Sequence, residues 1–159
     1  NIVVPLACPL CHYKTERLVI TVGTKQADSS AIYCSNSKCF GQEKEKIIHF
    51  VSKKAFDIDG LGEKIVEQLI ETGSIQTPAD LFILKESDIK DLERFAEKSA
   101  KNLIAAIEKS KHIALPRFIF ALGIPHVGEE TALDLTYKFG TLEKLKDATK
   151  EDFNALVNV

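Results

Sequence analysis

All four cysteines of this chain lie within its first 39 residues, in two close pairs. Cys8 and Cys11 form a C-x2-C pair, and Cys34 and Cys39 form a C-x4-C pair after a spacer of 22 residues. Each pair can present two thiolates from one tight turn, and the spacer can bring the second turn to face the first. This pattern is typical of a structural zinc site, in which four thiolates leave no position open to water. A segment this small has too little core to fold alone, so the metal would supply its folding energy.

Other interpretations of the cysteines are two disulfides or four unrelated thiols. Disulfides require an oxidising compartment, and nothing in the sequence indicates export. His12 neighbours a ligand and is a minor alternative ligand, whereas His49 is expected to pack or to lie in a linker. Because four cysteines already complete a structural site, a zinc ion bound by cysteine alone is favoured.

The segment around the cysteines predicts a small β finger over residues 8–40. Residues 17–22 and 31–34 have the composition of short strands, and the polar stretch 23–30 is predicted to be their turn. A linker strand or turn is expected near 41–50. The finger and this linker end the first of two predicted domains.

The two predicted domains are a zinc finger with its N-terminal linker, residues 1–46, and an all-α domain, residues 47–159. Apolar residues in the second recur at three- and four-residue spacing, with Pro and Gly between the runs. Charge also changes along the chain: residues 1–54 carry eight basic and four acidic side chains, and residues 55–159 carry thirteen and nineteen. The predicted helices cover residues 62–72, 78–84, 87–92, 97–110, 115–122, 129–139, 142–147 and 150–157. The predicted core includes Leu69, Leu81, Leu92, Leu103, Ile107, Phe118, Leu122, Leu135 and Leu145.

The helical part contains an internal repeat. Three stretches open a helix in the same way: Asp59-Gly60-Leu61-Gly62-Glu63-Lys64, Glu93-Arg94-Phe95-Ala96-Glu97-Lys98 and Pro125-His126-Val127-Gly128-Glu129-Glu130. Their central apolar residues are 34 and 32 positions apart, and a further step of 32 reaches Val159. The residues that precede each turn are similar in the first and third copies, and in the second and fourth copies. Four helix–turn–helix units are therefore predicted, the fourth cut inside its turn. Thr77 and Thr149 are each followed three residues later by an aspartate, which predicts two helix caps.

Each predicted turn has the form x-hydrophobic-Gly and leads directly into a helix. Glycine permits positive φ and a close approach of the backbone. The unpaired N–H groups and positive dipole end of the following helix favour a bound phosphate. An acidic segment can therefore still bind DNA, because the attraction is local. The alternative is a helical scaffold that binds protein and no nucleic acid.

Several stretches resemble those of one enzyme family: Cys8-Pro9-Leu10-Cys11, Cys34-Ser35-Asn36-Ser37-Lys38-Cys39, the run from His49 to Gly62, Thr77-Pro78-Ala79-Asp80-Leu81-Phe82, the run from Glu97 to Leu103, and the run from Phe120 to Glu129. In this order, and over essentially its whole length, the chain resembles the C-terminal part of bacterial NAD-dependent DNA ligases. The resemblance implies a mainly α fold, in which a small β zinc finger precedes a four-fold helix-hairpin-helix domain.

The resemblance also implies a function. The parent protein would be a DNA ligase that seals nicks in duplex DNA in replication and repair, in the bacterial cytoplasm at the nucleoid, and would act as a monomer. This fragment would hold nicked double-stranded DNA without reading its sequence, through backbone N–H groups that contact phosphates. The implied DNA-binding residues are Lys53, Lys54, Gly60, Leu61, Gly62, Lys64, Lys98, His126, Val127 and Gly128. In the second turn Arg94 stands where the family usually has glycine and can supply charge in place of an amide, and the 22-residue zinc spacer is longer than usual.

The chain itself is not expected to catalyse ligation. The family's adenylated lysine lies in a Lys-x-Asp-Gly motif, and the only Asp-Gly here, Asp59-Gly60, has Asp57 at the lysine position. Asp59 is expected to cap the helix that follows. The parent enzyme's NAD and Mg²⁺ would be used by domains that this chain lacks, and the absence of methionine indicates a piece of a longer protein.

Two other functions remain open. The fragment can be a scaffold that docks the other ligase domains, with DNA contact secondary. It can also be the hairpin module of a repair nuclease, although such modules usually lack an attached four-cysteine finger. No run of about 18 apolar residues occurs, so no membrane partner is expected.

Overall fold

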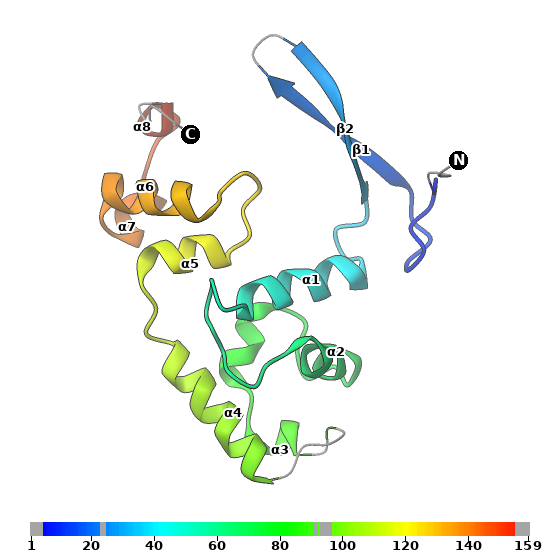
Figure 1. Ribbon diagram of the computed structural model, residues 1–159, viewed down its shortest axis with the longest axis vertical. Coiled ribbons are helices and arrows are strands. Elements are labelled where there is room, and N and C mark those ends of the chain that lie inside the picture. Colours follow the sequence, from blue (N-terminus) through cyan, green and yellow to red (C-terminus); the bar gives the residue numbers. More distant parts are fainter. Residues whose placement is uncertain (1–4, 23–24, 91, 93–96, 155–159) are drawn as a thin grey trace. The chain divides into compact units, whose positions relative to one another are not determined.

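The computed structural model describes residues 5–22, 25–90, 92 and 97–154 (Figure 1). The chain divides into two compact units, Asn1–Glu45 and Lys46–Val159. The sequence-based boundary, between residues 46 and 47, lies one residue further along the chain. The fold is mainly helical, and a small two-stranded sheet precedes the helical part, as the sequence predicted.

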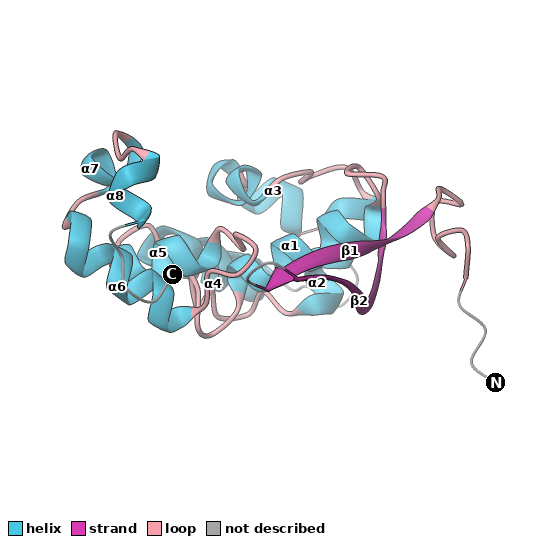
Figure 2. Ribbon diagram, turned by 90° about the horizontal axis from the view of Figure 1, so that it is seen from above, coloured by secondary structure: helices cyan, strands magenta, loops and turns pink. Residues whose placement is uncertain are grey.

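The first unit contains an antiparallel hairpin of β1 (Thr15–Val22) and β2 (Lys25–Cys34), drawn in magenta in Figure 2. Thr15 pairs with Cys34 at one end and Val22 with Lys25 at the other, with an irregularity between Arg17 and Val19. The turn predicted over residues 23–30 is therefore too long, because β2 already begins at Lys25. Polar residues enter a strand when the backbone ladder satisfies their N–H and C=O groups, so polarity alone did not define the turn.

Helix α1 (Phe40–Val51) corrects the linker strand or turn expected near residues 41–50. Its buried residues are Ile47, Phe50 and Val51, which lie three and four positions apart on one face. Residues 42–46 are all polar or charged, so the apolar spacing begins only in the second half of the helix. α1 also supplies the first helix of the first helix–turn–helix unit.

The other helices agree with the predicted ranges to within a few residues at their ends. They are α2 (Glu63–Glu71), the 3₁₀ helix η1 (Pro78–Ile83), α3 (Glu86–Ile89), α4 (Glu97–Ser110), α5 (Leu115–Ala121), α6 (Glu129–Phe139), α7 (Leu142–Lys146) and α8 (Lys150–Asn154). The segment predicted at 87–92 is helical only to Ile89, and the last three residues predicted at 150–157 lie outside the described residues. In the described part of the chain, no helix combines the length and the apolar character needed to cross a membrane.

Both predicted caps are present. The backbone N–H groups of Gln76 and Thr77 donate to the Asp80 carboxylate at 2.9 and 2.7 Å and lower its pKa. The backbone N–H of Thr149 likewise donates to Asp152 at 2.9 Å and lowers the pKa of that carboxyl group. The predicted cap at Asp59 is wrong: the N-cap of α2 is Gly62, with no side-chain cap hydrogen bond.

The helical unit has two clusters of buried side chains. The larger extends from Ile47 to Ala121, and the smaller groups Ile119, Ala132, Leu135 and Phe139. Among the predicted core residues, buried ones are Leu69, Leu81, Leu92, Leu103, Ile107 and Leu135, and partly buried ones are Phe118 and Leu145.

Leu122 is the exception in the predicted core, since half of its surface (50%) is exposed. Leu122 lies four residues after Phe118, which places both on one face of α5. The buried residues of α5 are instead Ile119 and Ala121. Leu122 is the C-cap residue, where α5 ends and its inward face no longer continues.

Candidate functional site

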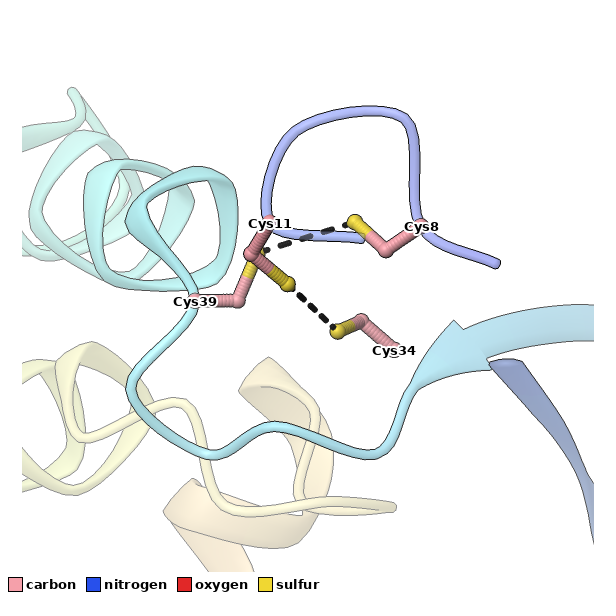
Figure 3. Close-up of side chains that lie close together, drawn as sticks. All are labelled: Cys8, Cys11, Cys34 and Cys39. Atoms are coloured by element: carbon pink, nitrogen blue, oxygen red, sulfur yellow. Dashed lines mark hydrogen bonds between the residues drawn. The ribbon is translucent and has the colours of Figure 1, made fainter. Parts of the chain in front are cut away.

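The four cysteine side chains converge on one point (Figure 3). Their sulfur atoms all lie within 4.8 Å of one another. The Sγ atoms of Cys8 and Cys39 are 3.8 Å apart, and those of Cys11 and Cys34 are 3.4 Å apart. Four sulfurs at about 2.3 Å from a tetrahedral zinc ion would be about 3.8 Å from one another. These distances also exceed the roughly 2.05 Å of an S–S bond, so the four thiols are free.

Two tight turns hold these sulfurs in place. In the first, the backbone N–H of Cys8 donates to the carbonyl oxygen of Tyr13 at 2.7 Å, and His12 adopts a φ of 57°. In the second, the N–H of Asn36 donates to the Cys34 sulfur at 3.4 Å, and Cys39 immediately precedes α1. Among the described residues, the cluster of possible metal ligands consists of the four cysteines alone, without His12.

The pKa values of Cys11 and Cys34 are shifted in opposite directions. The backbone N–H of Tyr13, opposed by burial and aided by neighbouring thiols, lowers the pKa of Cys11 to about 6. Burial, aided by neighbouring thiols, raises the pKa of Cys34 to about 12. Four crowded thiols therefore do not all ionise by themselves, whereas a metal ion at their centre would favour all four thiolates. The residues present fit a structural metal ion bound by four sulfurs.

The first glycine turn connects α1 to α2. Gly60 has a φ of +81°, a left-handed conformation that suits glycine. Leu61 is buried, and its N–H donates to the carbonyl oxygen of Ile58 at 3.2 Å. Gly62 is the N-cap of α2, with φ −80° and ψ 170°, and its carbonyl oxygen accepts the N–H of Val66 at 3.1 Å.

The third turn, between α5 and α6, has the same backbone 66 residues later. His126 takes the left-handed position of Gly60 with φ 67°, and the N–H of Val127 donates to Ile124 at 3.0 Å. Gly128 is the N-cap of α6, with φ −84° and ψ −176°. A second left-handed residue also recurs at this spacing, Asp57 in the first turn and Gly123 in the third. The sequence repeat is therefore a repeat of backbone conformation.

Both turns leave a helix N-terminus open. A Cβ added at Gly62 or Gly128 would meet no atom within 4 Å. The N–H groups in the first turn of a helix point outward along its axis, toward the positive end of the helix dipole, which makes each turn suited to a phosphate oxygen. Acidic residues at the helix starts, Glu63 in α2 and Glu129 in α6, weaken this attraction.

The predicted cationic helpers have different surroundings. Lys53, Lys64 and Lys98 are exposed, Lys98 in the first turn of α4. Lys54 instead forms an ion pair with Glu129 at 2.5 Å. The second turn, with Arg94, and the fourth turn at Val159 lie outside the described residues.

Sequence reasoning missed Arg117 and Glu129, which contact the first turn from the third hairpin. The Arg117 guanidinium donates to the carbonyl oxygen of Lys53 at 2.6 Å. It also lies 4.0 Å from the Asp57 carboxylate. No sequence signal indicated these residues, and the position of the first hairpin that corresponds to Arg117 carries Val51.

The hairpin geometry agrees with two matches to known families. Residues 53–109 match the SAM-like Helix-hairpin-helix tandem, and residues 117–159 match the Helix-hairpin-helix motif. The first match includes the turn at Gly60 and the second the turn at His126. With the four-cysteine cluster, these motifs define a helix-hairpin-helix module that binds DNA.

Proposed function

We propose that this module is the DNA-binding part of an NAD-dependent DNA ligase and that it holds nicked duplex DNA. The observation that carries the proposal is the recurrence of one turn, with a left-handed residue, an inward apolar residue and a glycine N-cap, at Gly60–Gly62 and at 126–128. Its combination with a four-cysteine finger supports the ligase assignment over other hairpin proteins.

The turns would hold DNA through the N–H groups at the starts of α2 and α6. Contacts of this kind fix the position of a duplex without reading its bases. Lys53, Lys64 and Lys98 are exposed and can add charge, whereas Lys54 is already engaged by Glu129. We expect a small number of cationic contacts, and hence a modest salt dependence.

We further propose one structural Zn²⁺ bound by the four cysteines. It would fix the two cysteine turns and supply folding energy to a unit with little core of its own. Catalysis belongs to the parent enzyme, in which other domains would take AMP from NAD and use Mg²⁺. Those domains would be the partners of this module, in a monomeric enzyme of the bacterial cytoplasm, at the nucleoid.

A docking scaffold is the second candidate, and one observation favours it. Leu122 and Ile124 of the third hairpin are 50% and 45% exposed, whereas the corresponding Phe56 and Ile58 of the first hairpin are buried. Leu133 and Tyr137, one turn apart on α6, are exposed as well. The third hairpin thus presents an apolar surface that another ligase domain can cover. The repair-nuclease reading has no such observation in its favour.

The test is binding to a labelled nicked duplex, followed by fluorescence anisotropy across a salt series. A Gly62→Val/Gly128→Val variant covers both helix N-termini at positions where the backbone accepts a side chain and no neighbouring atom is displaced. The exposed Ala79→Val change is the matched control. We expect the double variant alone to lose binding. Wild-type binding that survives in the double variant would refute a DNA site at these turns, and absence of wild-type binding would favour the scaffold.

A further inference from the structure

Arg117 connects the third hairpin to the first. It lies in α5, the helix that leads into the third turn, yet its Nη2 donates to the carbonyl oxygen of Lys53, 2.6 Å away. The same guanidinium lies 4.0 Å from Oδ2 of Asp57, one of the two left-handed residues of the first turn. A side chain of one hairpin therefore holds the backbone that enters the turn of the other.

Lys54 makes the reciprocal connection. Its Nζ lies 2.5 Å from Oε1 of Glu129, the first residue of α6 and the neighbour of N-cap Gly128. A third contact joins the same segments: Nε2 of His49 donates to the carbonyl oxygen of Phe120 at 2.8 Å, and their rings lie 4.7 Å apart. The first and third turns are thus tied together by contacts at several points.

These polar contacts are not part of the repeated hairpin itself. At the matching positions, 66 residues away, Arg117 corresponds to Val51 and Lys54 to Phe120. A residue needed to build a hairpin would be expected in both copies. Lys54 and Glu129 are also more than half exposed, with 67% and 54% of their side-chain surface accessible, so their ion pair adds little to folding.

We propose that Arg117, Lys54 and Glu129 are positioning residues that hold the first and third turns at a fixed separation, so that both bind phosphates of one duplex at once. The inference rests on the proposed phosphate binding by the two turns. When one turn is bound, a fixed partner turn meets its phosphate at a high effective concentration. Loosening the pair would lower the affinity for a duplex that reaches both turns and leave the affinity for a shorter duplex unchanged.

Glu129→Gln distinguishes a positioning role from a purely electrostatic one, because the two predict opposite changes in the affinity for DNA. Removing a negative charge beside a phosphate site would by itself tighten DNA binding. Loss of the Lys54 contact, if that contact sets the separation of the turns, would weaken it. Glu130→Gln removes the same charge from the next residue, which is also exposed and makes neither of these interhairpin contacts. Arg117→Gln, which removes the other connection, is the second variant.

The measurement is the dissociation constant of each variant for a series of duplexes of increasing length. We expect Glu129→Gln and Arg117→Gln to bind long duplexes about tenfold more weakly than wild type. For short duplexes this loss should be absent, and Glu129→Gln should bind them at least as tightly as wild type. Glu130→Gln should bind long duplexes at least as tightly as wild type. If Glu129→Gln behaves like Glu130→Gln at every length, the positioning role is refuted. If the Gly62→Val/Gly128→Val variant binds DNA with the affinity of the wild type, the phosphate sites are refuted, and this inference with them.

Discussion

Replacing Gly60 by alanine tests whether the first turn depends on a left-handed glycine. The φ of Gly60 is +81°, and an added Cβ would have Leu103 Cδ1 as its nearest neighbour, at 3.9 Å. That distance is an ordinary contact, so the cost is conformational, about 1–2 kcal/mol for an L-residue in this region. Alanine also restricts the unfolded chain, which returns about 0.4–1 kcal/mol. We therefore expect Gly60→Ala to lower the free energy of unfolding by about 1 kcal/mol.

Gly62→Ala is the matched control two residues away. Gly62 has a φ of −80° and no atom within 4 Å of an added Cβ. The gain from the unfolded state and the poorer N-cap offset each other, so we expect a change within about 0.5 kcal/mol. Thermal unfolding of the zinc-loaded chain, followed by helical circular dichroism, should show Gly60→Ala melting about 4 °C below Gly62→Ala. Equal melting temperatures would contradict the left-handed requirement.

Three further predictions concern the core, the acid sensitivity and the metal. Leu81→Ala should lower the free energy of unfolding, measured in urea, by about 2–5 kcal/mol, because Leu81 is fully buried. Leu122→Ala should lower it by less than about 0.5 kcal/mol, because Leu122 is half exposed. Similar losses for the two variants would contradict the assigned burial. The backbone N–H groups of Gln76 and Thr77 lower the pKa of the Asp80 carboxyl group. The cap should therefore stabilise the folded chain fully above the pKa of an aspartate in the unfolded chain, about 4. This stabilisation should be lost as the pH falls through the lower pKa of Asp80 in the folded chain. Asp80→Asn should therefore cost about 1 kcal/mol at neutral pH and progressively less in acid, measured by unfolding at several pH values; a constant cost would argue against the cap. A chelator that removes zinc should unfold the cysteine finger and leave the separate core of the helical unit intact. Limited proteolysis of the two units would measure this. A finger that resists proteolysis after zinc removal would mean that the metal is not needed for its fold.

The repeat was predictable because the turn constrains its residues chemically. A left-handed backbone favours glycine, an inward position favours an apolar side chain, and a helix start tolerates glycine. Similar residues therefore recur around Leu61 and Val127. The cysteine cluster was predictable for the same reason, since thiolate spacing follows from tetrahedral geometry. The structure bears out both patterns at the level of geometry.

Other features could not be found in this way. The start of α1 carries charged residues whose helical state depends on tertiary packing of Ile47 and Phe50, so local pattern favoured a linker. Contacts between hairpins, such as Arg117 with Lys53, break the repeat instead of following it. Leu122 was wrongly placed in the core, because residue spacing identifies one face of a helix but does not show where other parts of the chain cease to cover that face.

The two left-handed positions in each turn have a consequence for how such hairpins diverge after duplication. The first turn places its glycine second, after Asp57, and the third places its glycine first, before His126. Each copy thus keeps one glycine and one side chain that tolerates this conformation, but in opposite order. A duplicated hairpin can therefore exchange which position is glycine while its backbone path is preserved. Descent among such turns is better traced by paired backbone angles than by any fixed pattern of glycines.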